Sequence, residues 1–170
     1  SMKHPKWNCD NLQNYQLLLD KVKFDKIVTT FFNFDVYLSD NEIKRQKQFE
    51  VRTIEYNAFL AQLKTATKEV HLILGEPRGE EFNPQAVIRN ELKAFMTEEE
   101  TRNTYAIHQK ALSLFTELDN IEIIDPIQHL CNEGICKTSN DTQGFYYKDN
   151  NHMRPWYAIE NLTYLDHIFL

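Results

Sequence analysis

The stretch EVHLILGEP at residues 69–77 decides the fold class of this chain. Its first six residues predict a β-strand, and Gly75-Glu76-Pro77 ends it. A similar run precedes it, KIVTTFFNF at residues 26–34, whose apolar and β-branched side chains do not alternate with polar ones and so predict a strand buried on both faces. A third run, IEII at residues 121–124, is closed by Asp125-Pro126.

Helical spacing of apolar residues separates these strands. It covers residues 10–22 and 51–63, resumes from residue 84, is strongest over 104–118, and recurs in a short helix ending at Leu130. Two short strands are expected beside Asn140-Asp141, and a last helix is expected over 155–167 with a proline in its first turn. The alternation predicts an α/β fold: a parallel sheet between helices, a three-layer αβα sandwich of the flavodoxin-like type.

A short segment that contains a polar residue lies at the end of each predicted strand. The three segments are Asn33-Phe34-Asp35, Gly75-Glu76-Pro77 and Asp125-Pro126. Sites in parallel sheets gather at the carboxyl ends of the strands, so these segments are expected along one edge. Asp125 is expected mainly to cap the helix that follows it.

Composition excludes several classes of protein. The chain has 170 residues, 42% of them hydrophobic, which is enough for one folded domain over residues 3–170. A formal charge of −6 makes nucleic acid a poor partner, and four glycines argue against a glycine-rich phosphate loop. No apolar stretch approaches the ~20 residues that span a bilayer. Ser1-Met2 is interpreted as a remnant of cloning, so an export signal or membrane anchor would lie upstream.

The three cysteines are Cys9, Cys131 and Cys136. The last two form C-x4-C around a turn, a spacing that a short disulfide loop can close. Two free thiols are the alternative, whereas zinc would need further ligands, and no second Cys or His pair stands at metal spacing. A disulfide would imply an oxidising compartment, with Cys9 left over.

Asp149 and His152 carry the strongest chemical signal. They lie three residues apart in a loop ahead of the last helix. This spacing lets the carboxylate hold one imidazole nitrogen while the other faces a cleft, as a hydrolase or acyltransferase needs in order to take a proton from a serine. The alternative is a helix-entry loop with a surface histidine. The other histidines, including His71 and His108, show no ligand spacing.

The chain resembles the SGNH (GDSL-like) hydrolase domain, in the form fused behind membrane acyltransferases of the acyltransferase-3 family, which O-acylate bacterial surface glycans. The resemblance rests on residues 24–30 (FDKIVTT), 70–77 (VHLILGEP), 123–126 (IIDP), 130–131 (LC), 136 (C) and 147–153 (YKDNNHM). The last four match the closing part of the family pattern, an Asp-Pro, a Cys pair and Tyr-x-Asp-x-x-His-Leu-Ser. Met153-Arg154 replaces the final Leu-Ser.

The resemblance implies that His152 is the general base for a nucleophilic serine and that Asp149 orients it. It also suggests Asn33 as an oxyanion donor, with a turn start at Asn33 as the alternative. No cofactor or metal is implied. The family's first block, Gly-Asp-Ser, has no counterpart here, so the chain is expected to lack the N-terminal strand and the nucleophile, and to be catalytically inert by itself. Ser39 is interpreted as a helix N-cap with Glu42, and neither Ser113 nor Ser139 sits at a strand-to-helix elbow.

The function implied is therefore the extracytoplasmic part of an O-acyltransferase that acylates a cell-surface glycan. Its partners would be the glycan acceptor or acyl-glycan and a membrane acyltransferase domain in the same polypeptide. That polypeptide would be tethered to the bacterial inner membrane, with this domain on the periplasmic or extracellular face. Two alternatives stay open: an inactive glycan-binding or accessory domain, and a stand-alone secreted carbohydrate esterase.

Overall fold

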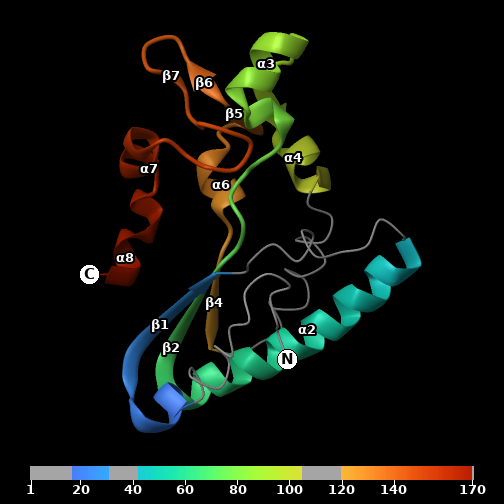
Figure 1. Cartoon of the computed structure of the whole chain (residues 1–170). Coiled ribbons are helices and arrows are strands. Elements are labelled where there is room, and N and C mark those ends of the chain that lie inside the picture. The colour runs from blue at the N-terminus through green and yellow to red at the C-terminus, as the bar shows by residue number, and fades with distance from the viewer. Residues whose placement is uncertain (1–16, 31–41, 105–119, 170) are drawn as a thin grey trace.

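The structure is a computed structural model that describes residues 17–30, 42–104 and 120–169 (Figure 1). Of the strongest predicted helix, residues 104–118, all but the first residue lie outside this described part, as does the proposed N-cap Ser39. Residues 17–21 are helical, within the predicted helix 10–22.

A parallel sheet forms the lower half of the molecule in Figure 1. Its strands are β1 (Phe24–Thr30), β2 (Thr67–Ile73) and β4 (Ile121–Ile124), in the order β1-β2-β4. In register, Val28 lies beside His71 and His71 beside Glu122. The predicted α/β class with a parallel sheet is confirmed.

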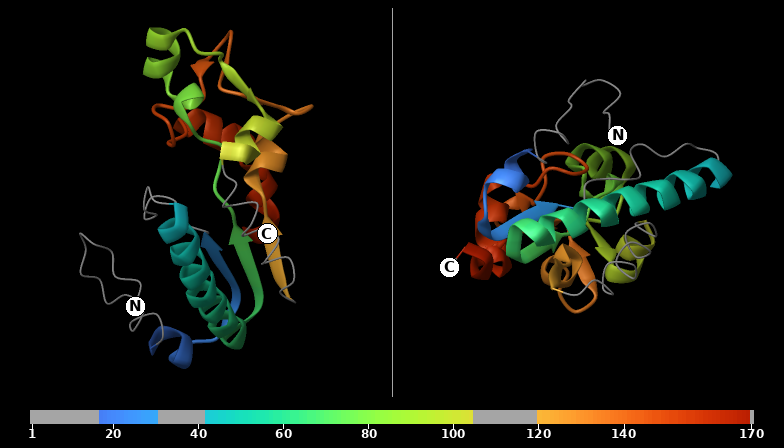
Figure 2. Two further views of the ribbon diagram at one scale, coloured as in Figure 1. Left: turned by 90° about the vertical axis from the view of Figure 1, so that its right-hand side faces the viewer. Right: turned by 90° about the horizontal axis from the view of Figure 1, so that it is seen from below.

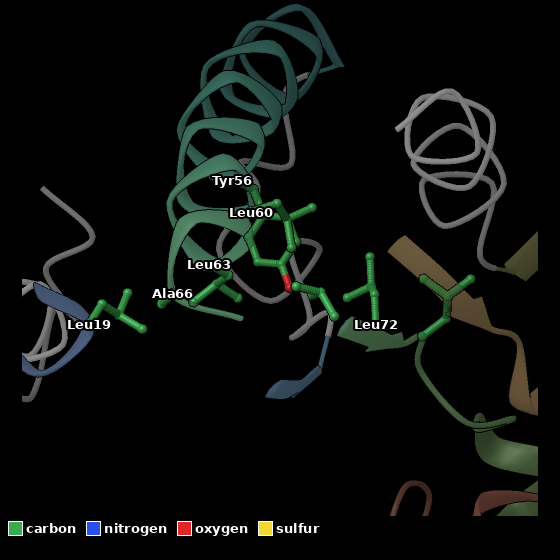
Figure 3. Close-up of a cluster of buried hydrophobic side chains, with 8 residues drawn as sticks. Leu19, Tyr56, Leu60, Leu63, Ala66 and Leu72 are labelled. Carbon is green, nitrogen blue, oxygen red and sulfur yellow. The ribbon is translucent and has the colours of Figure 1, made fainter. Parts of the chain in front are cut away.

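Helix α2 (Glu42–Ala66) covers one face of this sheet. Its buried side chains pack on Val70 and Leu72 of β2, and partly buried side chains of β1 and β4 complete the cluster. Figure 3 shows this first core, whose buried members are Leu19, Tyr56, Leu60, Leu63, Ala66, Val70, Leu72 and Leu74. Burying this apolar surface stabilises the layer by about 25 cal/mol per Å² removed from water.

The opposite face of the sheet is covered in part. The C-terminal helix α8 (Asp166–Phe169) lies against it, where Lys26 Nζ donates to the carbonyl of Ile168 at 3.1 Å. Along β1, partly buried and exposed residues follow one another, so the prediction of a strand buried on both faces is wrong for its described part. The physical reason is that β1 is the edge of the described sheet, and α2 shields only one of its faces.

Beyond the carboxyl ends of β2 and β4, the chain builds a second group of elements, seen above the sheet in Figure 1 and in the left view of Figure 2. In chain order they are η2 (Glu80–Phe82), α3 (Pro84–Asn90), β3 (Phe95–Thr97), α4 (Glu98–Thr104), α6 (Pro126–Leu130), β5 (Ile135–Lys137), β6 (Ser139–Asn140), β7 (Gly144–Phe145), α7 (Pro155–Asn161) and η3 (Thr163–Leu165). They enclose a second core, whose buried members are Phe82, Met96, Ile127, Cys131, Cys136, Tyr147 and Tyr157.

Most short predicted elements occur here. Two short strands do lie beside Asn140-Asp141, since β6 ends at Asn140 and pairs with β7 across a turn at residues 141–143, and α6 ends at Leu130 as expected. The last helix is not continuous, because α7 ends at Asn161 and a 3₁₀ turn precedes α8. The antiparallel pair β3–β5 was not predicted. Within the described ranges, no helix is both long and apolar enough to cross a membrane.

Candidate active site

The loop that carries Asp149 and His152 is closed at its base. Tyr147 and Met153 form an antiparallel bridge, and Lys148 N–H donates to the carbonyl of His152 at 2.9 Å. Gly79 N–H donates to the carbonyl of Asn150 at 3.0 Å, which ties the loop to the segment that leaves β2. The loop therefore lies on the carboxyl-end side of the sheet.

Asp149 and His152 contact each other directly. Nδ1 of His152 is 2.9 Å from both Oδ1 and Oδ2 of Asp149. A carboxylate at this distance favours a proton on Nδ1, so the lone pair of a neutral imidazole lies on Nε2. The His152 side chain is 60% exposed and that of Asp149 is 43% exposed, so the pair is open to solvent.

Asp149 also organises the backbone of its own loop. Its Oδ1 accepts hydrogen bonds from the N–H of Asn151 at 3.1 Å and of His152 at 2.8 Å. Desolvation raises the pKa of the Asp149 carboxyl, but these two N–H groups and the His152 ring lower it by more, so the net shift is downward. Asp149 is thereby kept as an anion, the form that supports an imidazolium.

An aromatic cluster supports the loop from below. Tyr147 is almost fully buried and meets Phe82 edge to face, with ring centroids 4.9 Å apart. Tyr146 stacks on Tyr157 of α7 with centroids 4.2 Å apart. Because Tyr147 begins the loop and α7 follows it, the second core fixes both ends of the loop.

Asp125, at the carboxyl end of β4, is a helix cap, as predicted. Its Oδ1 accepts from the N–H of Ile127 at 3.1 Å, at the start of α6. Its Oδ2 pairs with Arg102 of α4 at 2.7 Å, and Arg102 also pairs with Glu98 at 2.7 Å. Nothing in the sequence predicts the pairing of Arg102 with Asp125, because the two residues lie 23 positions apart in the chain.

The predicted disulfide is present between Cys131 and Cys136. It joins the end of α6 to β5 within the second core, where the hydroxyl of Thr101 also contacts the Cys136 sulfur at 3.3 Å. A shallow depression of about 410 Å³, lined by Glu98, Glu99, Arg102 and Asn103, includes neither Asp149 nor His152.

Four other residues singled out in the sequence, Asn33, Cys9, Ser39 and Ser113, lie outside the described residues. Ser139 is the one serine in the described ranges, and it lies in β6, paired with Phe145 of β7.

Comparisons with known proteins identify the family. A family model described as "SGNH domain (fused to AT3 domains)" matches residues 3–160. No curated protein matches the chain. No solved structure matches it either. Because the family model covers most of the chain and the parallel sheet agrees with its fold, the chain belongs to the SGNH domain family whose members are fused to AT3 domains.

Proposed function

We propose that this chain is the extracytoplasmic SGNH domain of an O-acyltransferase that transfers an acyl group, such as acetyl, to a cell-surface glycan. In this proposal His152 Nε2 removes the proton from a nucleophilic serine that lies outside residues 1–170. Asp149 holds Nδ1–H and stabilises the imidazolium that results. The serine oxygen attacks the acyl carbonyl, and the bond to the donor breaks as the donor oxygen takes the proton from His152. A glycan hydroxyl then gives its proton to His152 and attacks the acyl-serine ester, whose bond breaks and returns the free serine.

The observation that carries the proposal is the contact between His152 Nδ1 and both carboxylate oxygens of Asp149 at 2.9 Å, with the ring exposed. It leaves Nε2 as the free base of a neutral ring on an accessible surface. The family's recorded fusion to AT3 domains supports a membrane acyltransferase domain in the same polypeptide, and with it a place on the outer side of the inner membrane.

The test uses the full-length parent protein in cells that lack their own copy. Ester-linked acyl groups on the surface polysaccharide are released by mild alkali and measured. His152→Ala should reduce acylation by at least about 100-fold, since general base catalysis contributes about that much. His129→Ala, at another exposed histidine, is the matched control and should keep acylation near wild type.

Acylation that persists in His152→Ala would overturn the catalytic proposal and favour an accessory glycan-binding role. The isolated chain should not hydrolyse p-nitrophenyl acetate. Turnover by the isolated chain that is lost in His152→Ala would instead place the nucleophile within these 170 residues, as in a secreted esterase.

A further inference from the structure

Three side chains from distant parts of the sequence meet on the face of the sheet opposite α2. They are His71 of β2, Glu122 of β4 and His167 of α8, and one donor atom from each lies within 4.8 Å of the others. His71 and Glu122 are register partners in the parallel sheet. Oε2 of Glu122 is 2.7 Å from His71 Nδ1, and Oε1 is 2.9 Å from His167 Nε2. One carboxylate therefore lies between two imidazoles.

The protonation of His167 is constrained by its other nitrogen. Nδ1 is 2.8 Å from the carbonyl oxygen of Tyr164, which can only accept a hydrogen bond. Nδ1 therefore carries the proton, and in the neutral ring the lone pair of Nε2 faces Oε1 of Glu122. Two acceptors at 2.9 Å repel each other unless a cation lies at their junction.

His71 presents a similar conflict in a buried place. Its side chain is only 7% exposed, and among the described residues its one close polar neighbour is Glu122, whose Oε2 lies 2.7 Å from Nδ1 but off the direction of a well-formed hydrogen bond. Nε2 lies 3.7 Å from a carboxylate oxygen of Glu69, which favours a proton there and a lone pair on Nδ1. That lone pair faces Glu122 as well. A buried ring nitrogen that faces a carboxylate this closely without a well-formed hydrogen bond calls for an explanation, such as an ion between them.

We propose that His71 Nδ1, Glu122 and His167 Nε2 bind one divalent transition-metal ion, best matched by Zn²⁺. Two imidazole nitrogens and a carboxylate are a donor set that zinc accepts at about 2.0–2.2 Å, whereas Mg²⁺ and Ca²⁺ prefer oxygen ligands. Glu122 and His167 are about half exposed, so water completes the coordination. The Tyr164 carbonyl orients His167 from the outer shell.

The ion would fasten the C-terminal helix to the sheet. Its ligands come from β2, β4 and α8. On this face α8 is also tied to the sheet by the hydrogen bond from Lys26 of β1 to the carbonyl of Ile168. Binding of a ligand to the folded state alone raises the apparent stability. No motif in the sequence signals this site, because residues 71, 122 and 167 stand 51 and 45 positions apart, far from any ligand spacing.

The test measures zinc binding by the isolated, chelator-stripped chain. Equilibrium dialysis against ZnCl₂ with elemental analysis should give one ion per chain, and zinc should raise the thermal midpoint. Glu122→Gln and His167→Gln keep the size of the side chains, and each should weaken binding at least about tenfold, as even the loss of an outer-shell partner does. Cobalt(II) bound in place of zinc should show ligand-field bands that both variants reduce.

His152→Ala is the matched control, because His152 is also an exposed histidine beside a carboxylate but lies away from this cluster, and the variant should bind zinc as wild type does. Equal binding by wild type, Glu122→Gln and His167→Gln would overturn the proposal. The proposal would also be overturned if wild type failed to bind one zinc ion per chain. In that case the cation that neutralises Glu122 would be a proton on one of the two histidine rings. Should His71→Ala not fold, the two exposed positions still decide the question.

Discussion

At the scale of single residues, Asp149 has two functions that depend on the same negative charge. Its carboxylate accepts two backbone N–H bonds that shape the loop, and it also holds the ring of His152. An aspartate followed by a loop favours the first arrangement whether or not a histidine follows. What singles out this site is that the turn places His152 Nδ1 within 2.9 Å of both carboxylate oxygens.

The Asp149 carboxyl should titrate below its ordinary pKa of 3.8. Since the folded-state pKa is lowered, the stabilisation that the carboxylate gives the loop is complete above pH 3.8 and is lost as the pH falls through the lower folded value. Carboxyl-carbon NMR over a pH titration measures the midpoint. In His152→Ala the midpoint should move up toward 3.8, because the ring's lowering contribution disappears. A wild-type midpoint at or above 3.8 would contradict the geometry.

At the scale of elements, the sequence predicted those whose signals are local. IEII at 121–124 and the proline-led helices α6 and α7 occur at the predicted places. The β3–β5 pair joins residues about 40 positions apart, and its strands of three residues are too short for a periodic pattern. The same limit applies to the contact between Arg102 and Asp125, and to the meeting of His71 with His167.

Helix α4 begins with a capping box, whose sequence is Thr97-Glu98-Glu99-Glu100. Thr97 Oγ1 accepts from the N–H of Glu100 at 3.0 Å, and a Glu100 carboxylate oxygen accepts from the N–H of Thr97 at 2.8 Å. Thr97→Ala should therefore lower the free energy of unfolding by about 1 kcal/mol. Urea denaturation measures it. Glu99→Ala, inside the same turn, is the control and should stay within about 0.5 kcal/mol of wild type.

Helix α2 offers a pair of aliphatic residues that differ in burial. Leu60 is 0% exposed in the first core, whereas Ile54 is 70% exposed on the same helix. Leu60→Ala should lower the free energy of unfolding by about 2–5 kcal/mol, because it removes apolar contacts and leaves a cavity. Ile54→Ala should change it by no more than about 0.5 kcal/mol. Equal effects in chemical denaturation would mean that α2 does not cover the sheet as described.

At the scale of the whole molecule, the two hydrophobic cores have separate tasks. The first joins α2 to the sheet, and the second lies beyond the strands' carboxyl ends beneath the Asp149/His152 loop. The alternating pattern of helices and strands predicted the helix and the parallel sheet that enclose the first core. The second core contains aromatic rings from η2, the loop and α7. Because η2 is far from the other two segments in the sequence, the sequence pattern alone does not predict which of their residues meet. The candidate site therefore depends on the part of the fold that the sequence predicted least.

Tyr147 links the second core to the site, so its removal should affect both. Tyr147→Ala should lower the free energy of unfolding by about 3–5 kcal/mol, as for other large aromatic residues in cores. In the folded variant, Phe82 and Tyr157 lose their contacts with this ring, the bridge to Met153 loosens, and His152 is no longer held against Asp149. Acylation by the parent protein should then fall more than the folded fraction does. Phe169→Ala, at an exposed aromatic residue, is the control and should change neither quantity appreciably. If acylation in Tyr147→Ala only tracks the folded fraction, the second core stabilises the molecule without positioning Asp149 and His152.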